Sequence, residues 1–134
     1  MTYLLDTNTC IRFINGRSFG IRAKLLSIAD SEIVMSTIVQ AEMYAGSAKS
    51  QTRQRSREIQ DEFFRRFTSI PFDAQAAQIY GDIRASLEKQ GTSIGGNDLL
   101  IAATALARDL TLVTHNTREF ERVNGLKLED WEDA

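Results

Sequence analysis

A chain of 134 residues is long enough for one hydrophobic core but not two, so we expect a single domain over residues 1–134. Its one cysteine excludes an intramolecular disulfide and a cysteine-based metal cluster. No apolar run reaches the ~18 residues that span a bilayer and the first residues do not form a secretory signal, so we expect a cytoplasmic protein with no membrane partner. The net charge of −2 argues against a domain that binds nucleic acid through its overall charge.

Short runs of apolar and β-branched residues predict three strands and a weaker fourth, at 2–5, 33–36, 110–114 and 67–72. Helical patterns lie between them, at 37–48, 52–66, 74–90 and 99–108. Thr37 and Gln40 form a capping box for the first helix, and Gly91 ends the third. Strands that alternate with helices predict an α/β fold with a central, mainly parallel sheet flanked by helices, because parallel neighbours need crossover connections.

Two aspartates lie where a sheet of this kind binds its ligands, just beyond the carboxyl ends of the strands. Asp6 follows the first strand directly, where it is either a site residue or the N-cap of a following helix. Asp98 lies in the first turn of the last helix, and there an acid is either a site residue or a favourable partner of the helix dipole.

Glu42 is a third acid with an unusual setting. Its neighbours on the helical surface are apolar or small, and we expect this face to press on the sheet; they are Ile38, Val39, Ala45 and Gly46. A glutamate on a buried face loses several kcal/mol of solvation unless it is paired or bound to metal. The alternative is a residue at the margin of the face whose side chain reaches water.

Together, Asp6, Glu42 and Asp98 can converge on one crevice. Two unit charges ~4 Å apart repel by about 4 kcal/mol at an effective dielectric of ~20, and a divalent cation relieves this repulsion. An all-oxygen donor set suits Mg²⁺ or Mn²⁺, whereas zinc prefers nitrogen or sulfur ligands, of which the side chains offer only His115 and Cys10. We therefore predict a Mg²⁺ site on the three carboxylates, with Mn²⁺ as a substitute.

Further polar residues follow the strand at 110–114. Asn116 either holds a metal-bound water, as a member of the catalytic set, or caps a short helix. Glu119 is either a fourth carboxylate or a solvated helix residue, and His115 is either a general base or an inert loop residue. We expect supporting roles around the site for Thr7, Asn8, Thr114 and Glu119.

Four segments, in order and spacing, resemble the VapC-type toxins of the PIN-domain family: Leu5–Cys10, Ser36–Gly46, Gly91–Ala102 and Leu112–Phe120. The likeness covers essentially the whole chain. It implies the toxin of a type II toxin–antitoxin system, an endoribonuclease with Mg²⁺ or Mn²⁺ on Asp6, Glu42 and Asp98. It also implies a homodimer and a VapB-type antitoxin partner. Many PIN domains have a fourth aspartate where Asn116 stands here, which leaves the affinity for a second metal ion open.

The substrate that the resemblance implies is RNA. The branch that shares the Asp-Thr-Asn start and the Asn-x-x-Glu-Phe segment includes members that cleave tRNA, with the anticodon region of initiator tRNA as a known target. Arg53 and Arg55 are our candidates for binding RNA phosphates. The alternatives for the 52–66 helix are a solvated face or an antitoxin surface.

Other functional classes fit the sequence less well. A phosphatase of the haloacid-dehalogenase type needs a second aspartate where Asn8 stands. A receiver-type signalling domain needs a lysine at the end of its last strand, where this chain has Thr114 and Asn116. A non-catalytic binding module would have little use for three retained carboxylates. A nuclease that cleaves DNA is also compatible with the sequence, because no residue in it is recognisable as a contact for the 2′-hydroxyl of RNA.

Overall fold

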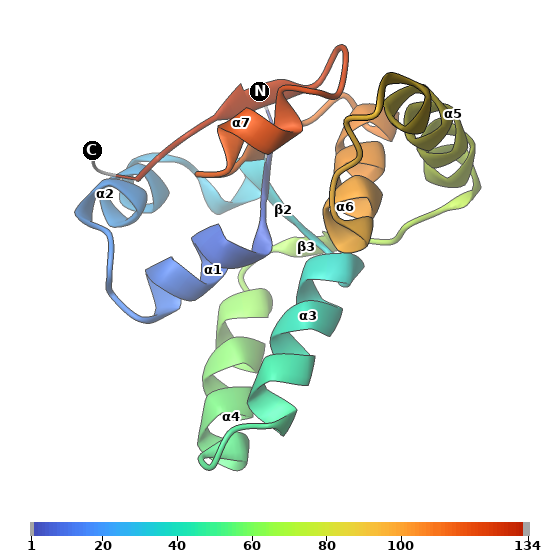
Figure 1. Cartoon of the computed structure of the whole chain (residues 1–134). Helices are drawn as coiled ribbons and strands as arrows, with labels where there is room; N and C mark the ends of the chain where they lie inside the picture. Colours follow the sequence, from blue (N-terminus) through green and yellow to red (C-terminus); the bar gives the residue numbers. More distant parts are fainter. Residues whose placement is uncertain (1, 133–134) are drawn as a thin grey trace.

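The computed structural model describes residues 2–132 as a five-stranded sheet with helices around it (Figure 1). The strands are β1 (Tyr3–Leu5), β2 (Ile33–Ser36), β3 (Thr68–Ile70), β4 (Thr111–Val113) and β5 (Lys127–Glu129). Their order across the sheet is β3-β2-β1-β4-β5, and every neighbouring pair is parallel. The prediction of an α/β fold with a mainly parallel central sheet is confirmed.

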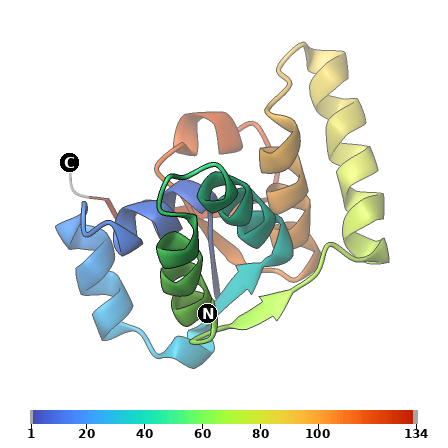
Figure 2. The same cartoon turned by 90° about the horizontal axis from the view of Figure 1, so that it is seen from below.

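The helices form three pairs and a short final turn. They are α1 (Thr7–Ile14), α2 (Phe19–Ser27), α3 (Thr37–Ala48), α4 (Arg53–Phe64), α5 (Ala74–Gln90), α6 (Gly96–Ala107) and α7 (Thr117–Phe120), with a 3₁₀ turn at Asp30–Glu32. The α3–α4 hairpin lies between the α1–α2 pair and the α5–α6 pair (Figure 2). Among the residues that the structure describes, no helix combines the length and the apolar character needed to cross a bilayer.

The central strand β1 and its neighbour β4 contribute fully buried residues to the core. Leu4 and Leu5 of β1, and Leu112 and Val113 of β4, are 0% exposed, as expected for a parallel sheet covered on both faces. Ile101 of α6 is equally buried against them in the same core cluster. Because β1 pairs with both β2 and β4, the residue that follows β1 emerges at the middle of the carboxyl edge of the sheet.

The predicted capping box at the start of α3 is wrong. Ser36 is the N-cap instead: its backbone is extended, and its side chain accepts a hydrogen bond of 3.0 Å from the Ile38 N–H. Thr37 is the first helical residue. Gln40 does not reach back to the cap, because its side-chain oxygen accepts a hydrogen bond of 2.7 Å from the hydroxyl of Ser69 in β3.

Candidate functional site

Asp6 lies between β1 and α1 and is only 5% exposed. Its Oδ1 accepts a hydrogen bond of 2.9 Å from the Thr9 N–H, so Asp6 is the N-cap of α1, as one of its two interpretations predicted. Its Oδ2 accepts a hydrogen bond of 2.6 Å from the hydroxyl of Thr114, the residue after β4. The carboxylate is therefore fixed by donors from two elements that meet at the sheet edge.

Glu42 is held across the site by residues of two other helices. Its Oε1 accepts a hydrogen bond of 2.5 Å from the Thr7 hydroxyl at the start of α1. Its Oε2 accepts a hydrogen bond of 3.2 Å from Nδ2 of Asn97 in the first turn of α6. The two contacts draw α1, α3 and α6 together around one carboxylate.

The face of α3 around Glu42 is not the buried face that the sequence predicted. The helix buries Val39, Met43 and Ser47, whereas Ala45 and Gly46 are exposed. The reason is that α3 packs on α1 and α4 as well as on the sheet, and the carbonyl of Met43 accepts a hydrogen bond from Gln60 of α4. Glu42 lies beside this stripe and is partly exposed, as its alternative interpretation stated.

Asp98 lies in the first turn of α6 and is partly buried. Burial, and then the negative charges of Glu119, Asp6 and Glu42, raise the pKa of its carboxyl to about 6. Four acids from four segments of the chain therefore share one electrostatic environment. Within residues 2–132, none of Asp6, Glu42 and Asp98 forms an ion pair with a lysine or an arginine.

Glu119 ties two loops of the site together. Its Oε2 accepts a hydrogen bond of 2.7 Å from the side chain of Asn116, and its Oε1 accepts one of 3.1 Å from the Gly95 N–H before α6. These two donors lower the pKa of Glu119, so it stays ionised beside Asp98. Asn116 precedes α7 without a side-chain capping bond, and its N–H donates to the Thr114 hydroxyl over 3.0 Å.

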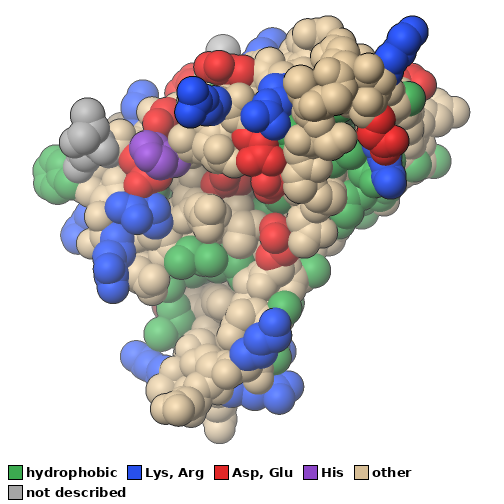
Figure 3. Space-filling view, viewed as in Figure 1, with side chains coloured by type: hydrophobic (Ala, Val, Ile, Leu, Met, Phe, Trp, Pro, Cys, Tyr) green, Lys and Arg blue, Asp and Glu red, His purple; other side chains and the backbone are tan. Residues whose placement is uncertain are grey.

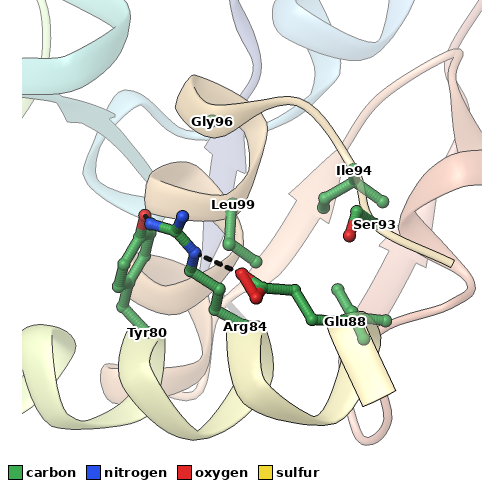
Figure 4. Close-up of a pocket in the computed structure, with 8 residues that line it drawn as sticks. Tyr80, Arg84, Glu88, Ser93, Ile94, Gly96 and Leu99 are labelled. Atoms are coloured by element: carbon green, nitrogen blue, oxygen red, sulfur yellow. Dashed lines mark hydrogen bonds and ion pairs between the residues drawn. The ribbon is translucent and has the colours of Figure 1, made fainter. Parts of the chain in front are cut away.

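Two hollows adjoin the acids, and a third lies elsewhere. A groove of about 790 Å³ starts at Asp6; its other lining residues are Asn8, Ile11, Arg12, Asn15, Arg17, His115, Asn116 and Glu132. A hollow of about 360 Å³ lies beside Glu42 and Asn97. A pocket of about 220 Å³ between α5 and α6 contains the ion pair of Arg84 with Glu88 and none of the four acids (Figure 4).

The donor set fits a hard divalent cation. Asp6, Glu42, Asp98 and Glu119 offer only carboxylate oxygens, which suit Mg²⁺ or Mn²⁺. Cys10 is fully buried, and burial raises the pKa of its thiol well above the usual value, so a thiolate is not available. Acidic side chains lie along the face above the α3–α4 hairpin in Figure 3, where an uncompensated set of carboxylates would attract a cation.

The other predicted residues are found in different places. Thr7 and Thr114 contact the acids directly, and Asn8 lines the groove. Arg53 and Arg55 are exposed in the first turn of α4 and touch none of the acids. The sequence prediction missed Asn97, although it directly precedes Asp98. It also missed Arg12, although Arg12 follows Asn8 at a spacing of four residues in a helix.

The chain was then compared with known proteins. Residues 3–126, from β1 to the segment before β5, match the model of the PIN domain. The chain belongs to the PIN-domain family. This PIN domain is 41% identical over 133 residues to Ribonuclease VapC2 of Rickettsia felis, covering 98% of this chain and 99% of that protein. It is 38% identical over 131 residues to the tRNA(fMet)-specific endonuclease VapC of Shigella flexneri, covering 98% of each.

Solved structures agree with this membership. This PIN domain has a TM-score of 0.92 and 40% identity to VapBC2 from Rickettsia felis bound to a DNA fragment, covering 98% of this chain and 100% of that one. DNA-bound VapBC from Salmonella typhimurium gives the same TM-score at 38% identity, with 98% of each chain covered. The resemblance to VapC-type proteins is confirmed, and the phosphatase-like and receiver-like alternatives are set aside.

Proposed function

We propose that this PIN domain is a metal-dependent endoribonuclease that hydrolyses phosphodiester bonds of RNA. The observation that carries the proposal is the convergence of Asp6, Glu42 and Asp98. Burial, and then the charges of Glu119, Asp6 and Glu42, raise the pKa of Asp98, and no basic side chain of the described chain pairs with the three acids. Similarity over almost the whole length to proteins named ribonuclease supports the same activity.

Asp6, Glu42 and Asp98 would hold the cation, Mg²⁺ with Mn²⁺ as a substitute. When bound, such a cation polarises the phosphate and lowers the pKa of a coordinated water. The chain itself supplies orientation. Thr114 and the Thr9 N–H fix the Asp6 carboxylate, and Thr7 and Asn97 fix Glu42. Donors of this kind keep ligand oxygens in position before a substrate arrives.

Asn116 belongs to the proposed catalytic set as the residue that orients the attacking water. It lines the groove next to Asp6, and its amide nitrogen is engaged by Glu119. The amide oxygen is then the side-chain atom that accepts a hydrogen bond from a water. In-line attack by that water would leave a 5′-phosphate and a free 3′-hydroxyl on the RNA.

The biological setting follows the relatives. We propose that the chain is the toxin of a type II toxin–antitoxin pair and that a VapB-type antitoxin binds it, because its structural neighbours are VapBC assemblies. A homodimer in the cytoplasm is part of the proposal as what the family resemblance implies. The substrate we propose is the initiator tRNA, on the strength of the Shigella flexneri relative's name. The anticodon region as the target is what the family resemblance implies.

The test is cleavage of total RNA and of purified initiator tRNA by the isolated protein with Mg²⁺, followed by end mapping. We expect defined fragments that disappear with EDTA and with Asp6→Asn. Asp82→Asn, which changes an exposed acid on α5, is the matched control and should cleave like the wild type. Cleavage by Asp6→Asn at the wild-type rate would overturn the proposed site, and no cleavage of any RNA by the wild type would overturn the proposed activity.

A further inference from the structure

One face of α1 forms a polar wall of the groove that starts at Asp6. Asn8, Ile11, Arg12 and Asn15 lie at i, i+3, i+4 and i+7, so they share one side of the helix, and all four are exposed. The opposite side carries the buried Thr9 and Cys10. The groove lining therefore continues from the acid end of the site along the whole length of α1.

The end of α1 adds a second cation to this wall. Gly16 has a φ of 64°, and this left-handed turn lets the Arg17 N–H donate to the carbonyl of Arg12 over 2.9 Å. Arg12 and Arg17 thus line the same groove. Two guanidinium groups and the amides of Asn8 and Asn15 are the donors that phosphate oxygens accept from most readily.

The C-terminal end of the described chain touches the same wall. Glu132 forms an ion pair with Arg12, and its side chain is only 9% exposed. His115 holds this segment from the other side: its Nδ1 lies 2.9 Å from Asp130 Oδ2 and 3.4 Å from Glu132 Oε2. Arg17, by contrast, has no acidic partner anywhere in residues 2–132.

The arginines of α4 are placed less favourably for a strand that reaches Asp6. Arg57 donates to Ser47 and to the Tyr44 carbonyl, so its charge is committed within the hairpin. Arg53 and Arg55 are exposed, but α4 begins at the tip of the hairpin, beyond the last residue of α3 (Figure 1). With a rise of 1.5 Å per residue, the 12 residues of α3 separate that tip from the sheet edge by about 18 Å.

We propose that the RNA strand lies in the α1 groove, with Arg12 and Arg17 on its phosphates, and that Glu132 occupies Arg12 until a phosphate displaces it. The inference rests on the proposed ribonuclease function and deepens it, because it names the surface that binds the substrate backbone. Glu132 then lowers the affinity for RNA without contacting the carboxylates of the proposed catalytic site. The arginines of the α4 tip contribute little to binding in this arrangement.

Fluorescence anisotropy with a 5′-labelled single-stranded RNA tests the groove apart from cleavage, because EDTA keeps the strand intact. We expect Arg12→Ala and Arg17→Ala each to weaken binding about fivefold at low salt. Each should also make the negative slope of log affinity against log salt shallower by about 0.7, the value for one lost phosphate contact on a single strand. Glu132→Gln should tighten binding, and Arg12→Lys, which keeps the charge, should retain most of it.

The control is the double variant Arg53→Ala with Arg55→Ala, which removes two positive charges from α4, one more than either single groove variant removes. Unchanged binding by this control, with loss in the groove variants, supports the inference. Loss in the control and wild-type binding by the groove variants overturns it. Adding Mg²⁺ to the same samples reports cleavage separately. If the wild type cleaves RNA but Arg12→Ala and Arg17→Ala bind it normally, the proposed function stands and the inference fails. If these variants bind RNA more weakly but the wild type cleaves none, only the proposed function is overturned.

Discussion

Hydroxyl and amide groups, rather than cations, hold Asp6, Glu42 and Glu119 at the carboxyl edge of the sheet. The Thr114 hydroxyl is the clearest case, because it donates to Asp6 Oδ2 and accepts from the Asn116 N–H. Thr114→Val keeps the shape of this fully buried side chain but removes both bonds. We expect RNA cleavage to fall about tenfold, the usual effect of losing a residue that orients a metal ligand.

Steady-state cleavage with saturating Mg²⁺ measures this effect, and circular dichroism checks that the fold is intact. Thr114→Ser keeps the hydroxyl and is the control, with cleavage near the wild-type rate. A Thr114→Val protein that is folded and fully active would show that Asp6 needs no such support.

Asp98 gives a pH dependence whose sign follows from its raised pKa. Between the ordinary value of 3.8 and the folded-state value of about 6, the folded protein binds more protons than the unfolded chain. The free energy of unfolding of the metal-free protein therefore falls as pH rises through this range. After allowance for partial exposure, we expect a loss of about 1–2 kcal/mol that is complete above pH 6.

Urea unfolding of wild type and Asp98→Asn in EDTA, at pH 4.5 and pH 8, measures this loss. The variant should be more stable than the wild type by a larger margin at pH 8, because asparagine has no charge that is costly to bury or that repels Glu119, Asp6 and Glu42. An equal margin at both pH values would contradict the raised pKa.

The residues of the site were predictable to the extent that strand ends reveal them. Asp6 and Asp98 were found because polar residues at the carboxyl end of a strand, or at the start of a helix, stand out against apolar runs. The surroundings of Glu42 could not be predicted, since only tertiary packing decides which face of α3 is buried. The roles of Asn97 and Arg12 likewise depend on which helices lie side by side, and a single sequence does not show this.

At the scale of elements, the α3–α4 hairpin is held by Arg57, an arginine that sequence reasoning did not single out. Arg57 donates to Ser47 Oγ and to the Tyr44 carbonyl, each over 3.2 Å, and lies 4.5 Å above the Tyr44 ring. Arg57→Ala should lower the free energy of unfolding by about 1–2 kcal/mol through these lost contacts.

Chemical unfolding of Arg57→Ala beside Arg55→Ala tests the hairpin contact with a neighbour as control. Arg55 is exposed on the same helix, so its replacement should change stability by less than about 0.5 kcal/mol. Equal losses in the two variants would mean that helix propensity, not the contacts with α3, sets the effect.

Sequence reasoning missed α2, β5 and the 3₁₀ turn, and it offered helices at α1 and α7 only as alternatives. For α2 and β5 the reasons are physical. In α2, Ile21 and Leu25 face the core at helical spacing, but the exposed Phe19 and Leu26 blur the apolar stripe. The edge strand β5 has three residues, two of them charged, and pairs only with β4. A segment this short becomes a strand because it pairs with the neighbouring strand, and its own residue types do not predict it. The longer helices α3 to α6 were predictable because their periodic patterns run over three turns or more.

At the scale of the whole molecule, the order of the sheet decides which distant residues meet. Placing β1 between β2 and β4 brings Asp6, Thr114 and the start of α3 to one edge, although they are up to 108 positions apart in the chain. The α6 helix, which packs on the hairpin helix α3 and on β4, adds Asp98. The fold therefore assembles a set of carboxylates whose mutual repulsion the proposed cation would neutralise.

Binding of Mn²⁺ to the isolated protein, followed by electron paramagnetic resonance of the free ion, tests this assembly most directly. We predict that the wild type removes Mn²⁺ from solution, that Mg²⁺ competes for the same site, and that Asp6→Asn and Glu42→Gln each abolish most of the binding, whereas Asp82→Asn does not. Wild-type protein that leaves Mn²⁺ free, or Asp6→Asn protein that binds it as the wild type does, would contradict the account.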